Sequence, residues 1–238
     1  MVNSACFSSS LLQRFFPSRC LICQLPSRRS RELCVDCEAD LPWLGARCRQ
    51  CALPLPRGSS ALLCGKCVSK PPAFSRCLCP LRYDFPVDRL ITGFKHHRQF
   101  THAALLAQLW IEATADLIGD PSPDIIMPVP LHWRRRFQRG YNQSELLAKW
   151  WSDALHIPIL NALRRHRATP SQQGLSAKQR RRNLYKAFIL CKPEQIQGKH
   201  IALVDDVLTT GATAHSLAAI LARNGARQID IWCLARTP

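Results

Sequence analysis

One stretch of thirteen residues, IALVDDVLTTGAT at 201–213, constrains the fold of this chain more than any other. Its first four residues, Ile201 to Val204, are apolar and predict a buried strand. Asp205 and Asp206 stand at the end of that strand, and a tight, glycine-containing turn leads into an apolar run at helical spacing. Strands and helices alternate elsewhere in the chain as well, so we expect an α/β fold: a parallel sheet with helices on both faces.

The same stretch predicts a binding site. Ligands of open parallel sheets bind beyond the carboxyl ends of the strands, where the two acids lie. A small turn at a helix start presents backbone N–H groups to an anion. Paired carboxylates beside such a turn suit a sugar diol, with or without Mg²⁺, so a phosphorylated ribose satisfies all three features. The alternative is a core strand that ends in a solvated turn, for which two adjacent acids are an unusual choice.

The pattern of four apolar residues, two acids, two apolar residues and T-T-G-x-T resembles the signature of type I phosphoribosyltransferases over all thirteen positions. The resemblance implies that Asp205 and Asp206 act as the catalytic acids and hold the ribose 2′- and 3′-hydroxyls of phosphoribosyl pyrophosphate (PRPP). It also implies that the 5′-phosphate is held by the backbone and hydroxyls of Thr209, Thr210, Gly211, Ala212 and Thr213.

Eight of the thirteen cysteines fall in four C-x2-C pairs. Two thiolates at this spacing face one tetrahedral ion, and four such ligands close a structural zinc site. Redox-active thiols are the alternative, but a redox C-x2-C pair normally occurs singly before a helix. We therefore expect structural zinc, in two sites, bound by Cys20, Cys23, Cys34, Cys37, Cys48, Cys51, Cys64 and Cys67.

An internal repeat bears on how these cysteines pair. Residues 20–26 read CLICQLP and residues 48–54 read CRQCALP, which gives a period of 28 residues. A repeat usually marks a self-contained unit, so we expect the first two pairs to bind one ion and the last two pairs to bind the second. An interleaved arrangement, first pair with third and second with fourth, is the alternative.

Net charge and hydropathy restrict the kinds of ligand and the cellular location that we expect for this chain. The formal net charge is +17, and residues 131–186 hold thirteen Lys or Arg and two acids. Such a basic stretch suits a polyanionic small molecule, a nucleic-acid backbone or a solvated helix face. The chain has no apolar run of about 20 residues and no basic start before its short N-terminal apolar patch, so we expect no membrane insertion and a cytoplasmic protein.

The expected organisation is a lead at 1–19, a double zinc-binding segment at 20–70 and an α/β domain at 71–238, with Pro71-Pro72 at the boundary. Apolar periodicity predicts helices at 86–97, 102–118, 143–155 and 213–224. It predicts strands at 81–85, 124–129, 158–163, 201–205 and 229–235. A polar segment at about 166–185 is expected to be a flexible loop that closes over the site.

A second loop must meet the same substrate if the chain is a transferase. The strand that ends at Val129 is followed by a basic turn, HWRRRFQRGYNQSELL, which is the natural place for a pyrophosphate loop. The candidate residues are Pro130, Leu131, Arg134, Arg139, Asn142, Gln143 and, from the segment GFKHHRQF, Lys95.

The whole pattern resembles the ComF family, and within it the GntX-type proteins. The resemblance is carried by the cysteine pairs, LITGFK, VPLHWRRRFQRGYNQSELLA, and RATPSQQGLSAKQRRRNLYKAF ahead of VDDVLTTGAT. It implies a zinc-finger segment fused to a phosphoribosyltransferase fold, with a connection to competence and the use of external DNA.

Two hypotheses follow. The first is a Mg²⁺-dependent phosphoribosyltransferase that acts on PRPP or a related phosphorylated sugar. The second is a non-catalytic adaptor that keeps the PRPP pocket as a sensor and holds single-stranded DNA or DNA-uptake proteins. A homodimer is compatible with either, whereas a purely structural zinc scaffold would leave the VDDVLTTGAT turn without a purpose.

Overall fold

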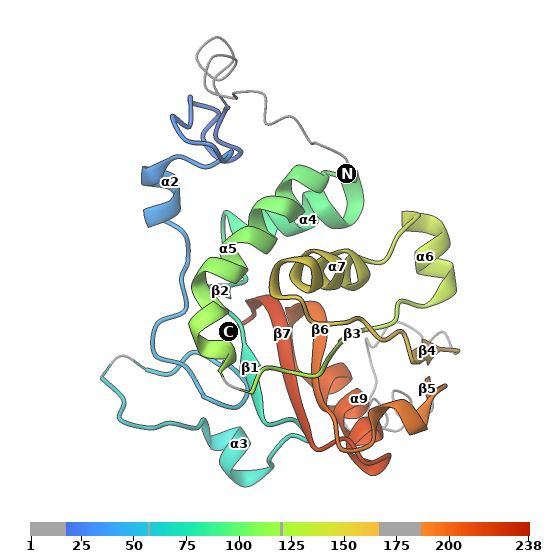
Figure 1. Ribbon diagram of the computed structural model, residues 1–238. Helices are drawn as coiled ribbons and strands as arrows, with labels where there is room; N and C mark the ends of the chain where they lie inside the picture. Colours follow the sequence, from blue (N-terminus) through green and yellow to red (C-terminus); the bar gives the residue numbers. More distant parts are fainter. Residues whose placement is uncertain (1–17, 57, 120, 167–186) are drawn as a thin grey trace. The chain divides into compact units, whose positions relative to one another are not determined.

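The computed structural model describes residues 18–56, 58–119, 121–166 and 187–238 (Figure 1). The chain divides into two compact units, Met1–Pro42 and Trp43–Pro238, which are described separately below. The expected lead up to residue 17 and most of the expected closing loop lie outside the described residues. Within the described ranges, no helix has both the length and the apolar character needed to cross a membrane.

The first unit is a small cysteine-rich fold. A β-bridge pairs Arg19 with Pro26, and the short helix α2 (Val35–Ala39) follows. The N-cap of α2 is Cys34, whose Sγ accepts a hydrogen bond from the Cys37 amide at 3.4 Å. Among residues 18–42, the buried hydrophobic side chains other than Cys20 are Leu33 and Leu41, which is too few for a core, so we expect this unit to depend on its cysteines for folding.

The second unit is built on a parallel sheet. Its strands are β1 (Arg76–Leu78), β2 (Leu81–Arg82), β3 (Ile125–Pro128), β6 (His200–Leu208) and β7 (Gln228–Arg236). The order is β1-β7-β6-β3, and β2 also pairs with β7. All of these pairings are parallel. The strand expected at 81–85 is thus shorter, and β1 before it was not predicted.

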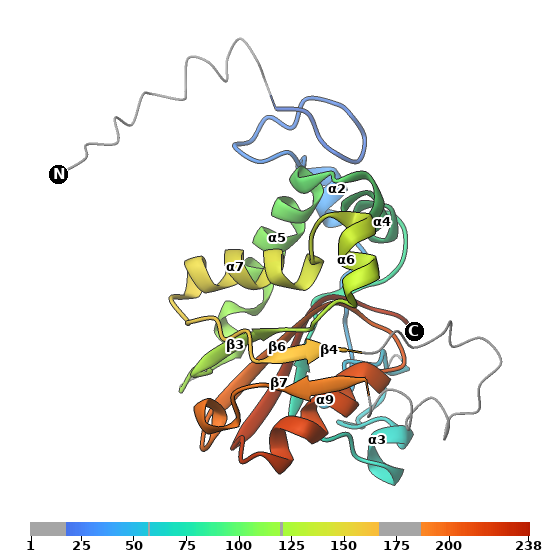
Figure 2. The same ribbon diagram turned by 90° about the vertical axis from the view of Figure 1, so that its right-hand side faces the viewer.

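Helices cover both faces of this sheet (Figure 2). The helices α4 (Val87–His97), α5 (Phe100–Ile118) and α7 (Gln143–Leu155) lie together, and α5 and α7 contact the strands from one face. The helix α9 (Ala212–Arg223) packs on the opposite face. The α/β architecture expected from the sequence is confirmed.

Three tryptophans join the first helical layer to the sheet. Trp110 of α5 stacks on Trp151 of α7 with ring centroids 4.0 Å apart, and it lies 4.9 Å from the ring of Trp232 in β7. All three side chains are fully buried. This arrangement fixes α7, and with it the loop before α7, against the strands.

The face covered by α9 holds a second core that extends beyond the sheet. Leu217 and Leu221 of α9 pack there with Leu203 and Ile231 of the strands. Ala52, from the second cysteine repeat, belongs to the same cluster. The second cysteine repeat, with its short helix α3 (Gly65–Ser69), is therefore part of the same unit as the sheet.

Two smaller elements flank the undescribed segment 167–186. The strands β4 (Leu163–Arg165) and β5 (Phe188–Leu190) pair antiparallel. The strand expected at 158–163 coincides with β4 only at Leu163, so most of that prediction is wrong. A 3-10 helix, η1 (Pro193–Ile196), follows β5, and a parallel bridge joins Ile159 to Ile126 of β3.

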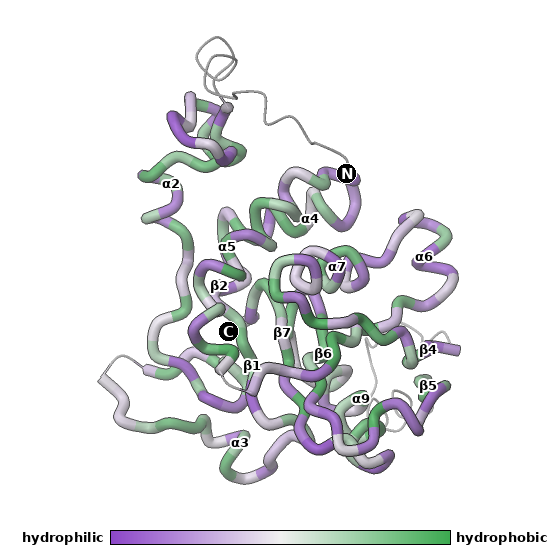
Figure 3. The backbone as a smooth tube through the Cα atoms, viewed as in Figure 1, coloured by the Kyte–Doolittle hydropathy of each residue, from purple (hydrophilic) through white to green (hydrophobic). Residues whose placement is uncertain are grey.

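The helix α6 (Trp133–Arg139) occupies a region expected to be a loop. Its seven residues carry four arginines and one aromatic pair, Trp133 and Phe137, which is too short a pattern for periodicity to predict a helix. Figure 3 shows the contrast between its polar residues and the hydrophobic first half of β6.

Candidate functional site

Asp205 and Asp206 lie near the carboxyl end of β6, which runs between β3 and β7. The Val129 amide donates to the Val204 carbonyl at 2.9 Å, so β3 ends directly beside the two acids. Both acids are partly buried. Parallel packing therefore brings the β6 acids and the loop that begins at Pro130 to one edge of the sheet, as the sequence predicted.

The environment of Asp205 is unusual for a carboxylate. Burial, together with the neighbouring negative charge of Asp206, raises the pKa of Asp205 to about 7. The Asp206 amide donates to Asp205 Oδ1 at 2.9 Å, and Ser144 Oγ lies 3.3 Å from the same oxygen. An acid held in this state gains from a ligand that brings hydroxyl donors or positive charge.

Lys95 supplies one positive charge at this edge. Its Nζ lies 3.0 Å from Asp206 Oδ2, and both side chains are mostly buried. Lys95 belongs to the last turn of α4, which is held in place because Tyr141 donates its hydroxyl hydrogen to the Phe94 carbonyl. The structure thus brings Lys95 to the acid pair from a segment more than a hundred residues away in sequence.

The turn at 209–213 begins where β6 ends. Gly211, the N-cap of α9, has φ 73°, a left-handed conformation that glycine adopts without strain. The first amides of a helix have no partner within the helix, and α9 points these groups toward the turn. Thr209 and Thr210 are exposed. The turn therefore has the backbone conformation that the predicted anion site requires, while anion binding by these residues stays a prediction.

The loop after β3 is anchored by its polar residues. Asn142 caps α7 by accepting from the Ser144 amide at 3.1 Å, and its Nδ2 donates to the Val129 carbonyl at 3.0 Å. Gln143 is buried, and its Oε1 accepts from Arg139 at 3.1 Å. Pro130 and Leu131 are partly buried beside the strand end.

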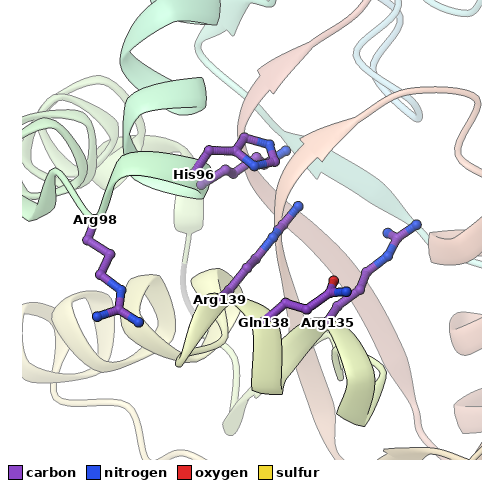
Figure 4. A pocket seen from close by; sticks show the side chains of 6 residues that line it. His96, Arg98, Arg135, Gln138 and Arg139 are labelled. Atoms are coloured by element: carbon purple, nitrogen blue, oxygen red, sulfur yellow. The ribbon is translucent and has the colours of Figure 1, made fainter.

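A cationic cavity of about 400 Å³ lies between the end of α4 and α6 (Figure 4). In Figure 4, Arg135, Gln138 and Arg139 rise from α6 toward the end of α4 that carries His96. Among the described residues, those that line it are Lys95, His96, Arg98, Arg135, Gln138 and Arg139.

The electrostatics of this cavity suit an anion. Partial desolvation and the nearby charges of Arg139 and Lys95 lower the pKa of His96, so cations surround this imidazole. Arg139 and Lys95, both predicted from sequence, thus line one cavity. Arg134 does not line it, and its guanidinium lies over the exposed ring of Trp133, 5.3 Å from the centroid.

Several residues of this region were not predicted as site residues. Ser144 lies near Asp205, because its Oγ is 3.3 Å from Asp205 Oδ1. His96, Arg98, Arg135 and Gln138 complete the cavity. Only their nearness to predicted residues in the sequence, as in the run Lys95-His96, could have indicated them.

The cysteine pairs assemble into two four-cysteine clusters, each with all sulfurs within 4.8 Å of one another. The clusters are Cys20, Cys23, Cys34 and Cys37, and Cys48, Cys51, Cys64 and Cys67. This is the sequential pairing, and the interleaved alternative is wrong. Zn–S bonds of about 2.3 Å in a tetrahedron place sulfurs about 3.8 Å apart. The Cys23–Cys34 distance is 3.8 Å and the Cys51–Cys64 distance is 3.6 Å, so both clusters fit zinc.

Comparison with known proteins agrees with these observations. A family model described as a double zinc ribbon domain matches residues 11–68. The DNA utilization protein YhgH of Salmonella typhi is 39% identical over 229 residues, which cover 93% of this chain and 98% of that protein. The competence protein F of Haemophilus influenzae is 35% identical over 231 residues, covering 94% and 100%. The chain belongs to the ComF family.

Solved structures similar to this ComF member include phosphoribosyltransferases. Adenine phosphoribosyltransferase from Saccharomyces cerevisiae has a TM-score of 0.41 and 14% identity, covering 59% of this chain and 72% of that one. Purine phosphoribosyltransferase from Pyrococcus horikoshii has a TM-score of 0.39 and 22% identity, covering 56% and 74%. At these values the likeness carries no conclusion about activity.

Proposed function

We propose that this ComF protein binds PRPP with Mg²⁺ and transfers its phosphoribosyl group to an acceptor, releasing pyrophosphate. One observation carries the proposal: the acid pair at the end of β6 lies between the Gly211 turn and the Lys95 end of a cationic cavity. A ribose with phosphoryl groups at both ends presents three matching groups. Its diol suits the acid pair, its 5′-phosphate suits the Gly211 turn, and its pyrophosphate suits the cationic cavity.

The residues have distinct roles in this proposal. Asp205 and Asp206 hold the ribose hydroxyls and favour positive charge on the sugar as the bond from C1′ to pyrophosphate breaks. The backbone of 209–213 holds the 5′-phosphate. Lys95 and Arg139, with the Pro130–Leu131 backbone, hold the leaving pyrophosphate, while Asn142 and Gln143 keep that loop in position.

The donors at the acid pair also suit Mg²⁺. This ion binds oxygen ligands, and it usually takes one or two carboxylates together with substrate phosphates and waters. Asp205 and Asp206 provide carboxylate oxygens, and Lys95 already compensates part of their charge. The residues thus fit an ion that arrives with the substrate. When bound, it would help to neutralise the departing pyrophosphate.

Calorimetry with PRPP and Mg²⁺ tests the proposal. The double variant Asp205→Asn/Asp206→Asn should bind PRPP at least tenfold more weakly than the wild type, because both diol acceptors lose their charge. Asp116→Asn is the matched control, since Asp116 is an exposed acid of α5. Equal affinity of the wild type and the double variant would remove the proposal.

The names of the relatives support a biological setting for the proposed chemistry. They are called DNA utilization protein and competence protein, and we propose that this chain likewise serves the use of external DNA. Its two thiolate clusters would hold zinc most readily in a reducing compartment such as the cytoplasm.

A second candidate function is an adaptor for single-stranded DNA that keeps the sugar-phosphate pocket as a sensor. The surface of α6 favours it, because Trp133 is 61% exposed and Phe137 is 88% exposed beside the run Arg134–Arg136. Exposed aromatic rings among arginines form a stacking surface for unpaired bases. Tyr141, by contrast, packs between Phe94 and Phe100.

Salt-dependent binding of single-stranded DNA tests this candidate. Trp133→Ala/Phe137→Ala and changes at Arg180–Arg182, which lie outside the described residues, should weaken that binding, while the Asp pair should not affect it. Absence of pyrophosphate release with every amine, base or nucleotide acceptor would favour the adaptor. Unchanged DNA affinity in the aromatic variant would contradict it.

A further inference from the structure

The second zinc ribbon, residues 48–67, contacts the turn that we assign to the 5′-phosphate. Lys66 Nζ lies 3.4 Å from the Thr210 carbonyl oxygen, although the two residues are 144 positions apart. We propose that Lys66 is a phosphate-binding residue, which the second ribbon supplies to the sugar-phosphate site. The proposal rests on the function proposed above and adds a residue that the sequence pattern of the turn does not contain.

The turn itself lacks a positive side chain. Its sequence, TTGAT, provides hydroxyls, backbone amides and the start of α9, all of which are neutral or carry only partial charge. A phosphate monoester carries up to two negative charges near pH 7, and hydrogen bonds from a charged donor are stronger than those from neutral ones. In the described part of the chain, two cationic side chains contact this turn, Lys66 and Arg236.

Arg236 has a structural role. Its side chain is 6% exposed, and it donates to carbonyl oxygens both in the second ribbon and at the start of the turn. Nε donates to the Cys51 carbonyl at 3.1 Å, and Nη1 donates to the carbonyls of Leu208 and Thr209 at 3.0 and 2.5 Å. Arg236 is therefore a positioning residue that ties the second ribbon to the start of the turn.

Of the two cations, Lys66 and Arg236, Lys66 is the one whose charged group a ligand can reach. It is exposed, and it stands between Cys64 and Cys67, two ligands of the second cluster. Those cysteines are buried and hold the short helix α3, so the Cα atom of Lys66 has a fixed position relative to the turn. Gln50 strengthens the same attachment by donating to the Phe74 carbonyl at 3.2 Å.

The contact of Lys66 with a carbonyl oxygen at 3.4 Å is long for a hydrogen bond. An ammonium group on a four-carbon stem can turn from such a weak acceptor to a phosphate oxygen with little loss. A lysine that only stabilised the turn would contribute to stability and leave affinity for the ligand unchanged. This difference separates the two roles in solution.

The experiment compares two ligands on three variants by calorimetry with Mg²⁺. PRPP carries the 5′-phosphate, and inorganic pyrophosphate lacks it. Lys66→Gln should weaken PRPP binding about tenfold and change pyrophosphate binding less than about twofold, whereas Lys66→Arg should retain most of the PRPP affinity. Lys70→Gln is the matched control, because Lys70 is an exposed lysine that caps the same helix.

Zinc content and thermal melting first show that the variants are folded. Each calorimetric result then either supports or contradicts the proposal. PRPP affinity that is unchanged in Lys66→Gln overturns it and leaves the proposed function standing. An equal loss for PRPP and pyrophosphate also overturns it, since the effect would then not be specific to the 5′-phosphate. If the wild type does not bind PRPP, both the proposed function and this inference fail.

Discussion

The two zinc ribbons have the same local structure and different surroundings. In the first, the Cys20 amide donates to the Leu25 carbonyl at 2.8 Å, and in the second the Cys48 amide donates to the Leu53 carbonyl at 2.9 Å. The equivalent residues Gln24 and Ala52 both have positive φ, 63° and 55°. The repeat in the sequence therefore specifies one backbone conformation twice.

The tertiary contacts of the ribbons differ. In the first cluster Cys20 is buried but Cys23 is exposed, whereas in the second cluster three cysteines are buried. Ala52 belongs to the main core, while its counterpart Gln24 is exposed. The repeat therefore sets the metal site, and the residues around it decide whether a ribbon forms part of the larger fold.

The largest expected effect comes from removing one metal site at a time. Cys48→Ser/Cys51→Ser should lower the melting temperature of the larger unit by about 10 °C, because the loss of a structural zinc site costs several kcal/mol and each kcal/mol shifts Tm by about 2–4 °C. Cys20→Ser/Cys23→Ser should leave this transition unchanged. Calorimetric melting with zinc analysis checks both variants.

Each variant should retain one zinc ion of two. If the two variants lowered the main transition equally, the ribbons would be equivalent and the comparison would be wrong.

The next effect concerns the contact between the second ribbon and the turn. Arg236→Lys should destabilise the larger unit by about 2–3 kcal/mol, because the buried guanidinium donates to the carbonyls of Cys51, Leu208 and Thr209, and a lysine cannot replace all of these bonds. Amides at 48–52 and 209–213 should exchange faster together in hydrogen-exchange mass spectrometry. Faster exchange at only one of these segments would show that Arg236 does not join them.

The stability of the larger unit should depend on pH through Asp205. The folded-state pKa of Asp205 is about 7, above its ordinary value, so the charged form is disfavoured on folding and stability is lost as pH rises from about 4 to above 7. Asp205→Asn removes this loss and should raise Tm by several degrees at pH 8, and by less at pH 5. An increase that did not depend on pH would contradict the pKa assignment.

The smallest effect is expected in the first ribbon. Partial burial raises the pKa of Glu38, but hydrogen bonds from Arg29 and Arg31 outweigh it and lower the pKa overall. Glu38→Gln should weaken zinc retention by less than about 1 kcal/mol, as for other partly exposed ion pairs. Competition with a metal chelator measures this retention. A change in PRPP affinity in this variant would contradict the independence of the first ribbon.

The elements and metal sites that the sequence predicted depend on local patterns. Residues 201–204 form an unbroken apolar run, the helix expected at 143–155 has apolar residues at Leu146, Leu147 and Trp150, and the two C-x2-C repeats identify their own partners by period. Asn142 also had a local signal, since Glu145 follows it three positions later as in a capping box. Periodicity and spacing need only neighbours in sequence, which explains why these features could be predicted.

The features that the sequence missed depend on residues that meet only in the folded chain. The Arg236 contact with Cys51 spans 185 positions, and Lys66 meets Thr210 across 144. Lys66 lies inside a C-x2-C pair, but that pattern specifies only its cysteines, and Arg236 lies in no recognisable pattern. The helix α6 was missed for another reason, because its seven residues carry four arginines and no buried side chain. Long-range contacts and fully solvated helices leave little trace in a single sequence.

Hydrogen-exchange mass spectrometry with and without PRPP and Mg²⁺ tests whether the second ribbon and the β6 turn form one sugar-phosphate site. If they do, PRPP slows amide exchange at 204–213 and also at 64–68 of the second ribbon. The exchange rates at residues 20–40 of the first ribbon stay unchanged. Protection of both ribbons alike, or of the turn without the second ribbon, would contradict this arrangement.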